Sequence, residues 1–148
     1  MRRIFIAIVA MAMLALTIST PASAQLPGTS MRAYIPFDFI VNGKTLPSGT
    51  YEVKRITDAP EGLLIRNVND KRDHSMFETE SVQQYGLPRH DEVVFNRYGD
   101  SYFLSEVLTG GMETGRRLAP SHTEKQLRRE MQMASNNAQP QTVTVAMY

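Results

Sequence analysis

The sequence has 148 residues, with 16 basic and 15 acidic side chains, and contains no cysteine. Without cysteine the chain has neither disulfide bonds nor zinc or iron–sulfur sites built on thiolates. Because the two signs of charge are nearly balanced, the composition argues against a general nucleic-acid-binding protein.

Residues 1–24 have the pattern of a secretory signal peptide. Arg2 and Arg3 precede an apolar run over residues 4–18, and the small residues Ala22-Ser23-Ala24 follow. The apolar run is too short to span a bilayer comfortably, and alanine at positions −3 and −1 suits a signal peptidase. We therefore expect cleavage after Ala24, with a retained N-terminal anchor helix as the alternative.

The remaining 124 residues are enough for one domain with a single hydrophobic core. A flexible leader is expected over residues 25–31, and the domain itself over residues 32–133. Its first strand has an apolar face made of Ile35, Phe37, Phe39 and Val41. Pro36 lacks an amide hydrogen, so this strand should lie at a sheet edge or be irregular there.

Three more strands are predicted before the middle of the chain, over residues 50–56, 63–68 and 74–82. The segment 58–62 contains Pro60 and Gly62 and is expected to break the chain between the first two. The strand over residues 74–82 is polar, which favours an edge position or a frayed strand.

Residues 91–108 are the best-defined element, a predicted β-hairpin around a Gly99-Asp100 turn. The turn fixes a register in which Phe95 faces Leu104 and Arg97 faces Tyr102. Arg97, Asp100 and Tyr102 would then gather a cation, an anion and an aromatic ring at the tip. This is a candidate recognition patch, although we favour an ordinary cation–π cross-strand pair as the explanation.

Residues 109–111 are expected to end the sheet, and a helix is predicted over residues 121–133. Ser121 and Glu124 have the spacing of a capping box, Leu127 and Met131 form a thin apolar face, and the charged residues, Arg128 among them, should be solvated. Residues 134–148 are expected to be a flexible tail or an edge strand.

Six short strands followed by one helix predict a mainly β fold. We expect an antiparallel meander that forms a small sandwich or barrel-like sheet, with one C-terminal amphipathic helix.

The ionisable side chains do not form a pattern typical of a catalytic or metal site. None of the three histidines, His74, His90 and His122, has the spacing of a zinc-binding pair. Only His90 and Glu92 could share a strand face, and two ligands make a poor site. Glu78 and Glu80 share a strand face, but an exposed strand explains them better than acid–base catalysis. We therefore predict no catalytic residue, no metal and no cofactor.

Three segments resemble those of a group of small secreted bacterial proteins of unknown function. They are an IPFDF segment at residues 35–39, a GK-x-LP-x-GTY turn at residues 43–51 and an RYGD-x-YFLSE hairpin at residues 97–106. In that group a charged helix usually follows the hairpin. The resemblance covers most of residues 35–130 and implies export, but it implies no activity and no site residues.

These observations predict an exported, non-enzymatic protein of the cell envelope, periplasmic or extracellular, with a binding or structural role. Its expected partner is an envelope protein or a small apolar ligand, and neither nucleic acid nor a transmembrane segment in the mature chain is expected. A small secreted hydrolase is the less favoured alternative. The main alternative is a carrier with an apolar cavity inside the sheet, lined by Phe37, Phe39, Tyr51, Phe95 and Leu104.

Expression of the whole chain in a bacterium, followed by intact mass spectrometry, tests the signal-peptide prediction. We expect a product that begins at Gln25. Replacing both Ala22 and Ala24 with Phe should block cleavage, because a signal peptidase requires small residues at these positions. A wild-type product that keeps residues 1–24 would favour the anchor helix instead.

Overall fold

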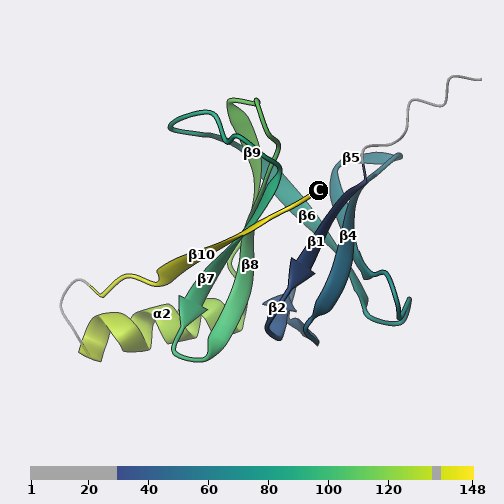
Figure 1. The fold of residues 1–148 in the computed structure, drawn as a ribbon. Coiled ribbons are helices and arrows are strands. Elements are labelled where there is room, and N and C mark those ends of the chain that lie inside the picture. The colour runs from purple at the N-terminus through teal and green to yellow at the C-terminus, as the bar shows by residue number, and fades with distance from the viewer. Residues whose placement is uncertain (1–29, 135–137) are drawn as a thin grey trace, which may run out of the picture.

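The computed structural model describes residues 30–134 and 138–148, which form ten β-strands and one α-helix (Figure 1). This confirms a mainly β fold with one helix near the C-terminus. The predicted signal peptide and residues 25–29 of the predicted leader lie outside the described residues. The elements are β1 (Met31–Ile35), β2 (Phe39–Val41), β3 (Lys44–Leu46), β4 (Gly49–Ile56), β5 (Ala59–Asn67), β6 (His74–Gln83), β7 (Glu92–Tyr98), β8 (Ser101–Leu108), β9 (Thr114–Leu118), α2 (His122–Ala134) and β10 (Gln141–Ala146).

The strands form one strongly curved, mostly antiparallel sheet with two halves (Figure 1). The first half contains β1, β4, β5 and the beginning of β6, and the second contains the end of β6 with β9, β8, β7 and β10. The short hairpin of β2 and β3 joins β8 through a parallel contact between Ile40 and Phe103, which makes the sheet mixed. The result is an open, curved, mixed sheet around one core.

Strand β6 connects the two halves, so the prediction that it lies at an edge is wrong. Its residues 74–78 pair with β5, and its residues 79–83 pair with β9. The polar composition has another cause: Ser75, Phe77 and Thr79 face the interior and are buried, while the residues between them face solvent. The outward-facing side of a central strand can therefore be mostly polar when that face is in contact with water, and here only Met76 is apolar between the buried positions.

The end of the chain lies beside β1. Strand β10 pairs with β7 along its whole length, so the structure has a strand within the segment for which we expected a tail or an edge strand. Beyond β10, Arg32 and Tyr148 exchange two backbone hydrogen bonds of 3.0 and 2.8 Å, and the amide of Met147 donates to the carbonyl of Asp91 at 2.7 Å. These bonds bring the first strand and the last residues together.

Two predicted strand boundaries are wrong. The turn between β4 and β5 is confined to Thr57 and Asp58, and residues 59–62 of the predicted break belong to β5. Pro60 has no paired residue in either neighbouring strand, so its missing amide hydrogen costs no ladder bond. Residues 109–111 do not end the sheet, because β9 follows and pairs with both β6 and β8. Its sequence, TGRRL, lacks the alternation by which the other strands were predicted.

The β7–β8 hairpin has the predicted register, with Phe95 opposite Leu104 and Arg97 opposite Tyr102. At the turn only Gly99 has a left-handed backbone, with φ of 60°. The sequence did not predict the irregularity between Val94 and Phe95, where the register shifts.

Helix α2 packs on the outer face of β7 (Figure 1). The Ser121 hydroxyl accepts the amide of Glu124 at 3.2 Å, as predicted for the first half of a capping box. Leu127 and Met131 are half-buried, and so is Arg128, which the sequence placed in solvent. No helix in the described residues is long and apolar enough to cross a membrane.

Replacing Met147 with Ala tests the role of the chain end. Met147 is only 6 % exposed and belongs to the core, so its truncation should lower the free energy of unfolding by about 2–5 kcal/mol. Urea denaturation measures the change. Met133, which is 86 % exposed on α2, is the matched control, and its replacement with Ala should change the value by less than about 0.5 kcal/mol. Equal effects of the two substitutions would contradict this role.

Candidate functional site

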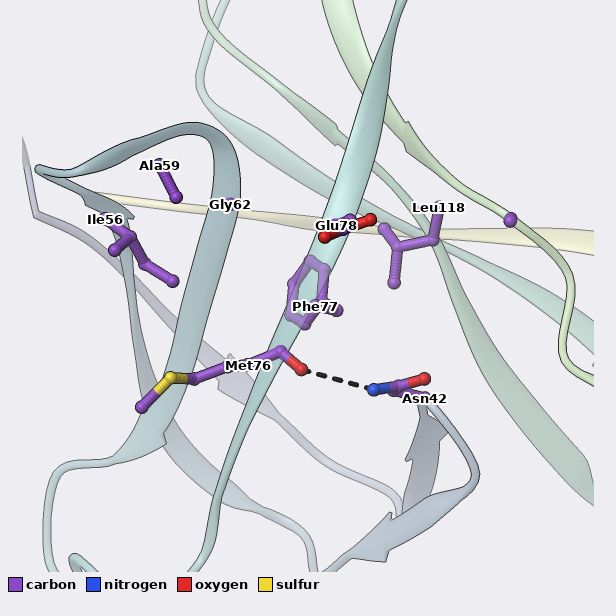
Figure 2. Close-up of a pocket in the computed structure, with 9 residues that line it drawn as sticks. Asn42, Ile56, Ala59, Gly62, Met76, Phe77, Glu78 and Leu118 are labelled. Carbon is purple, nitrogen blue, oxygen red and sulfur yellow. Dashed lines mark hydrogen bonds between the residues drawn. The ribbon is translucent and has the colours of Figure 1, made fainter.

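A surface pocket of about 560 Å³ lies where β6 changes its partner (Figure 2). We call it the β6 groove. Strand β5 forms one wall, and the end of β9 with the β2–β3 turn forms the other. Its lining residues are Asn42, Ile56, Ala59, Gly62, Met76, Phe77, Glu78, Leu118 and Ala119.

The pairing pattern of β6 explains the position of the groove. The last pair with β5 joins Gly62 to Glu78, and the first pair with β9 joins Thr79 to Leu118. Gly62 has no side chain, and a Cβ atom there would lie 3.1 Å from Cδ1 of Ile56. The glycine therefore leaves a hollow beside β6 that a larger residue would crowd.

Most of the groove surface is apolar. Ile56, Ala59, Phe77 and Leu118 provide hydrocarbon walls, and the Met76 side chain is 59 % exposed. Two polar side chains complete the lining. The Asn42 amide donates to the carbonyl of Met76 at 3.3 Å, whereas Glu78 forms no ion pair with any described residue. The groove thus offers apolar contact beside one carboxylate.

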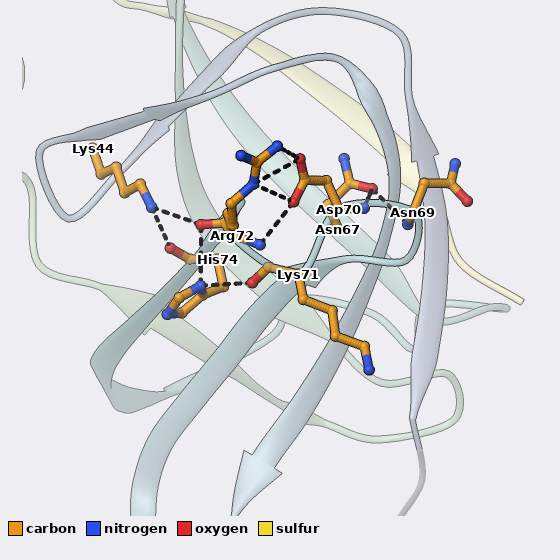
Figure 3. A network of polar contacts seen from close by, with 7 residues as sticks. All are labelled: Lys44, Asn67, Asn69, Asp70, Lys71, Arg72 and His74. Carbon is orange, nitrogen blue, oxygen red and sulfur yellow. Dashed lines mark hydrogen bonds and ion pairs between the residues drawn. The ribbon is translucent and has the colours of Figure 1, made fainter.

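A polar network holds the β2–β3 turn against β6 (Figure 3). The Lys44 ammonium donates to the carbonyls of Arg72 at 3.3 Å and His74 at 3.0 Å. The ring of His74 in turn contacts the carbonyl of Lys71 at 3.0 Å. His74 therefore belongs to a structural turn.

Asp70 and Arg72 form an ion pair of 2.7 Å in the same network (Figure 3). Hydrogen bonds from Arg72 lower the pKa of the Asp70 carboxyl to about 2. Because the folded-state pKa is the lower one, any stabilisation is present above the ordinary pKa of an aspartate and is lost as the pH falls towards 2. Arg72 is exposed and Asp70 is only half-buried, so the pair shapes the turn more than it stabilises the fold.

Glu52 is a buried carboxylate on β4, and its ion pairs lie within the first half of the sheet. Burial alone would raise its pKa, but hydrogen bonds from Lys54 and Arg66, both at 3.1 Å to Oε2, outweigh burial and lower the pKa. Arg32 on β1 lies 3.8 Å from the other oxygen. Glu52 therefore joins three strands and has no free oxygen for chemistry.

The structure brings the three residues of the candidate recognition patch together. The guanidinium carbon of Arg97 lies 5.3 Å from the centre of the Tyr102 ring, and its Nη2 lies 3.9 Å from Asp100. Tyr102 also stacks on Phe37 at a centroid distance of 3.9 Å, and Arg97 donates to the carbonyl of Gly99 at 2.7 Å. These contacts stabilise the hairpin and the edge of the core, and they leave only Asp100 fully exposed.

The other candidate residues lie apart. His90 and His122 are exposed in separate segments, and residues 30–134 and 138–148 contain no group of three His, Asp or Glu side chains that could hold a metal ion. The Arg116 guanidinium pairs with Glu61, and Arg117 pairs with Glu106 at 2.8 Å. The Arg116-Arg117 segment is therefore largely neutralised.

The aromatic residues proposed to line an internal cavity pack against one another instead. Phe39 makes edge contacts with Tyr51 and Phe95 at centroid distances of 5.0 and 5.4 Å, and Phe37 contacts Phe95 at 5.2 Å. Phe39, Tyr51 and Phe95 are at most 1 % exposed. An apolar ligand inside the sheet would have to displace these contacts.

Sequence reasoning missed the β6 groove. Gly62 within a strand was the available signal, because a glycine there often marks a close approach or a hollow. In the sequence, Gly62 fits a break in the chain as well as a hollow within a strand, so the glycine alone does not locate the groove.

No protein-family model matches the chain, and no curated protein or solved structure matches it. The resemblance of three segments to small secreted bacterial proteins therefore stays a prediction.

Proposed function

We propose that the chain is an exported, non-enzymatic protein of the cell envelope that binds a partner protein through the β6 groove. The observation that carries this proposal is the groove itself, which has a volume of about 560 Å³ and a lining slightly more apolar than polar, and which includes the exposed side chain of Met76. Its volume falls within the range of small-molecule pockets, about 300–1,000 Å³, so it has room for a single side chain of a partner protein.

The charge at the groove favours a particular kind of partner group. Glu78 lies in the lining and forms no ion pair with a described residue, while the walls around it are apolar. A carboxylate at the border of an apolar surface favours a positive charge next to an apolar group. The preferred occupant is an apolar side chain of a partner protein that adjoins a Lys or Arg.

A binding role is supported by the state of the ionisable groups around the groove. Glu61 pairs with Arg116, and the Lys44 ammonium is held by two backbone carbonyls. Acid–base catalysis needs a free, positioned acid or base within reach of the substrate. Among the described residues that line the groove, Glu78 alone is ionisable, so the groove offers no acid–base pair.

Export is supported by the position of the expected cleavage site. Residues 25–30 separate Ala24 from the beginning of β1 at Met31. Cleavage would therefore remove no residue of the sheet.

Binding of the uncharged fluorescent dye N-phenyl-1-naphthylamine tests the groove. The protein should raise the dye's fluorescence, and replacing Met76 with Glu should weaken binding at least about tenfold, about 1.4 kcal/mol, because a charge then enters the apolar surface. Tyr34 on β1 is 59 % exposed, like Met76, and replacing it with Glu is the matched control that should leave binding unchanged.

Competition against the dye tests the role of charge. Octylammonium should displace the dye better than octanol does, and replacing Glu78 with Gln should remove this preference. Binding that is unaffected by the Met76 substitution, or a wild-type protein that does not bind the dye, would contradict the proposal.

A further inference from the structure

A second pocket, of about 390 Å³, lies between α2 and the outer face of the sheet. We call it the helix pocket. Unlike the β6 groove it is mainly polar, and only Leu118 lines both. Its lining residues are Asn96, Ser105, Glu106, Arg117, Leu118, Pro120, Glu124 and Arg128.

Glu124 is the most buried charged residue of the helix pocket, with 4 % of its surface exposed. Its Oε1 accepts hydrogen bonds from Nδ2 of Asn96 at 2.9 Å and from the hydroxyl of Tyr98 at 3.3 Å, and it lies 3.9 Å from Nη2 of Arg128. The predicted capping box is therefore only half present, because this carboxylate turns towards the sheet and away from Ser121. Burial raises the pKa of Tyr98, so its hydroxyl keeps its proton and can donate to Glu124.

The second oxygen of Glu124 has no such partner. All three contacts above go to Oε1, and Oε2 makes no hydrogen bond or ion pair with a described residue. Every fully buried side-chain nitrogen and oxygen in the described part of the chain has a hydrogen-bond partner. Oε2 is therefore not fully buried. Glu124 lines the helix pocket and also a smaller pocket of about 30 Å³ next to Phe103 and Ser121.

Two guanidinium groups also border the helix pocket. Arg117 donates through Nε to Oε1 of Glu106 at 2.8 Å, and Arg128 donates through Nε to the Tyr98 hydroxyl at 3.3 Å. Nη2 of Arg117 also lies 2.8 Å from Oε1 of Glu106. A guanidinium has five N–H donors, so both arginines still keep donors beyond these contacts. Their side chains are 45 % and 40 % exposed, which leaves room for a ligand to reach them.

We propose that the helix pocket binds a small zwitterion, a compact molecule with one ammonium and one carboxylate group, such as a free α-amino acid. Oε2 of Glu124 receives the ammonium group, and the free donors of Arg117 and Arg128 receive the carboxylate. Glu106 and Glu124 balance the two arginines, so the pocket has no net charge. A simple anion would meet two carboxylates, and a simple cation would meet two guanidinium groups.

This site is independent of the β6 groove, since a different set of side chains forms it. A bound amino acid would also link α2 to β9, because it would contact Glu124 and Arg128 on the helix and Arg117 on the strand. Binding should therefore stabilise the folded protein by mass action.

Thermal unfolding in the presence of each of the twenty common L-amino acids tests the proposal. At least one should raise the melting temperature in a saturable way. The N-acetyl derivative of that amino acid, which keeps only the negative charge, and its carboxamide, which keeps only the positive charge, should have at least about tenfold lower affinity. No response to any amino acid, or equal responses to the three forms, would overturn the proposal.

Substitutions distinguish binding at the helix pocket from a general effect of amino acids on folding stability. Replacing Arg117 with Gln, or Glu124 with Gln, should abolish the response, while replacing Glu130, an exposed glutamate on the same helix, with Gln should leave it intact. Circular dichroism checks that each variant is folded. If the Glu124→Gln variant does not fold, the Arg117→Gln variant alone tests the proposal. A full thermal response of the Arg117→Gln variant to the amino acid would overturn it. The Met76→Glu variant should respond as the wild type does.

Discussion

The edge contacts of Phe39 with Tyr51 and Phe95 hold the two halves of the sheet together. Tyr51 comes from β4 in the first half, Phe95 from β7 in the second, and Phe39 from the short strand β2 between them. Such aromatic pairs contribute about 0.5–1.5 kcal/mol beyond the burial of their surface. The Tyr51 hydroxyl also donates to the carbonyl of Pro47 at 2.6 Å, so the ring is fixed at its polar end.

Because these rings fill the interior, the surface features available for binding lie on the outside of the sheet. The β6 groove and the helix pocket both lie next to β9, where the second half of the sheet joins β6. One is apolar with a single carboxylate, and the other is polar with balanced charges. The change of partner along β6 opens the first, and the packing of α2 on β7 encloses the second.

The sequence predicted those features that depend on neighbouring residues. Alternation in β4 and the turn at Gly99 determined the strands and the hairpin register, because side-chain period and turn geometry are local. The central position of β6 could not be predicted, since it depends on partners far along the chain and its outer face, Met76 apart, is mostly polar. Glu124 was correctly placed at the helix start, but its bonds to Asn96 and Tyr98 arise only after the helix packs on the sheet.

The central claim is that apolar groups bind on the outside of a filled sheet. Intermolecular nuclear Overhauser effects between N-phenyl-1-naphthylamine and the isotope-labelled protein test it most directly. The structure predicts contacts from the dye to the methyl groups of Ala59 and Met76, and none to the rings of Phe39 and Phe95. Contacts to those two rings would contradict the claim and would restore a carrier with an internal cavity.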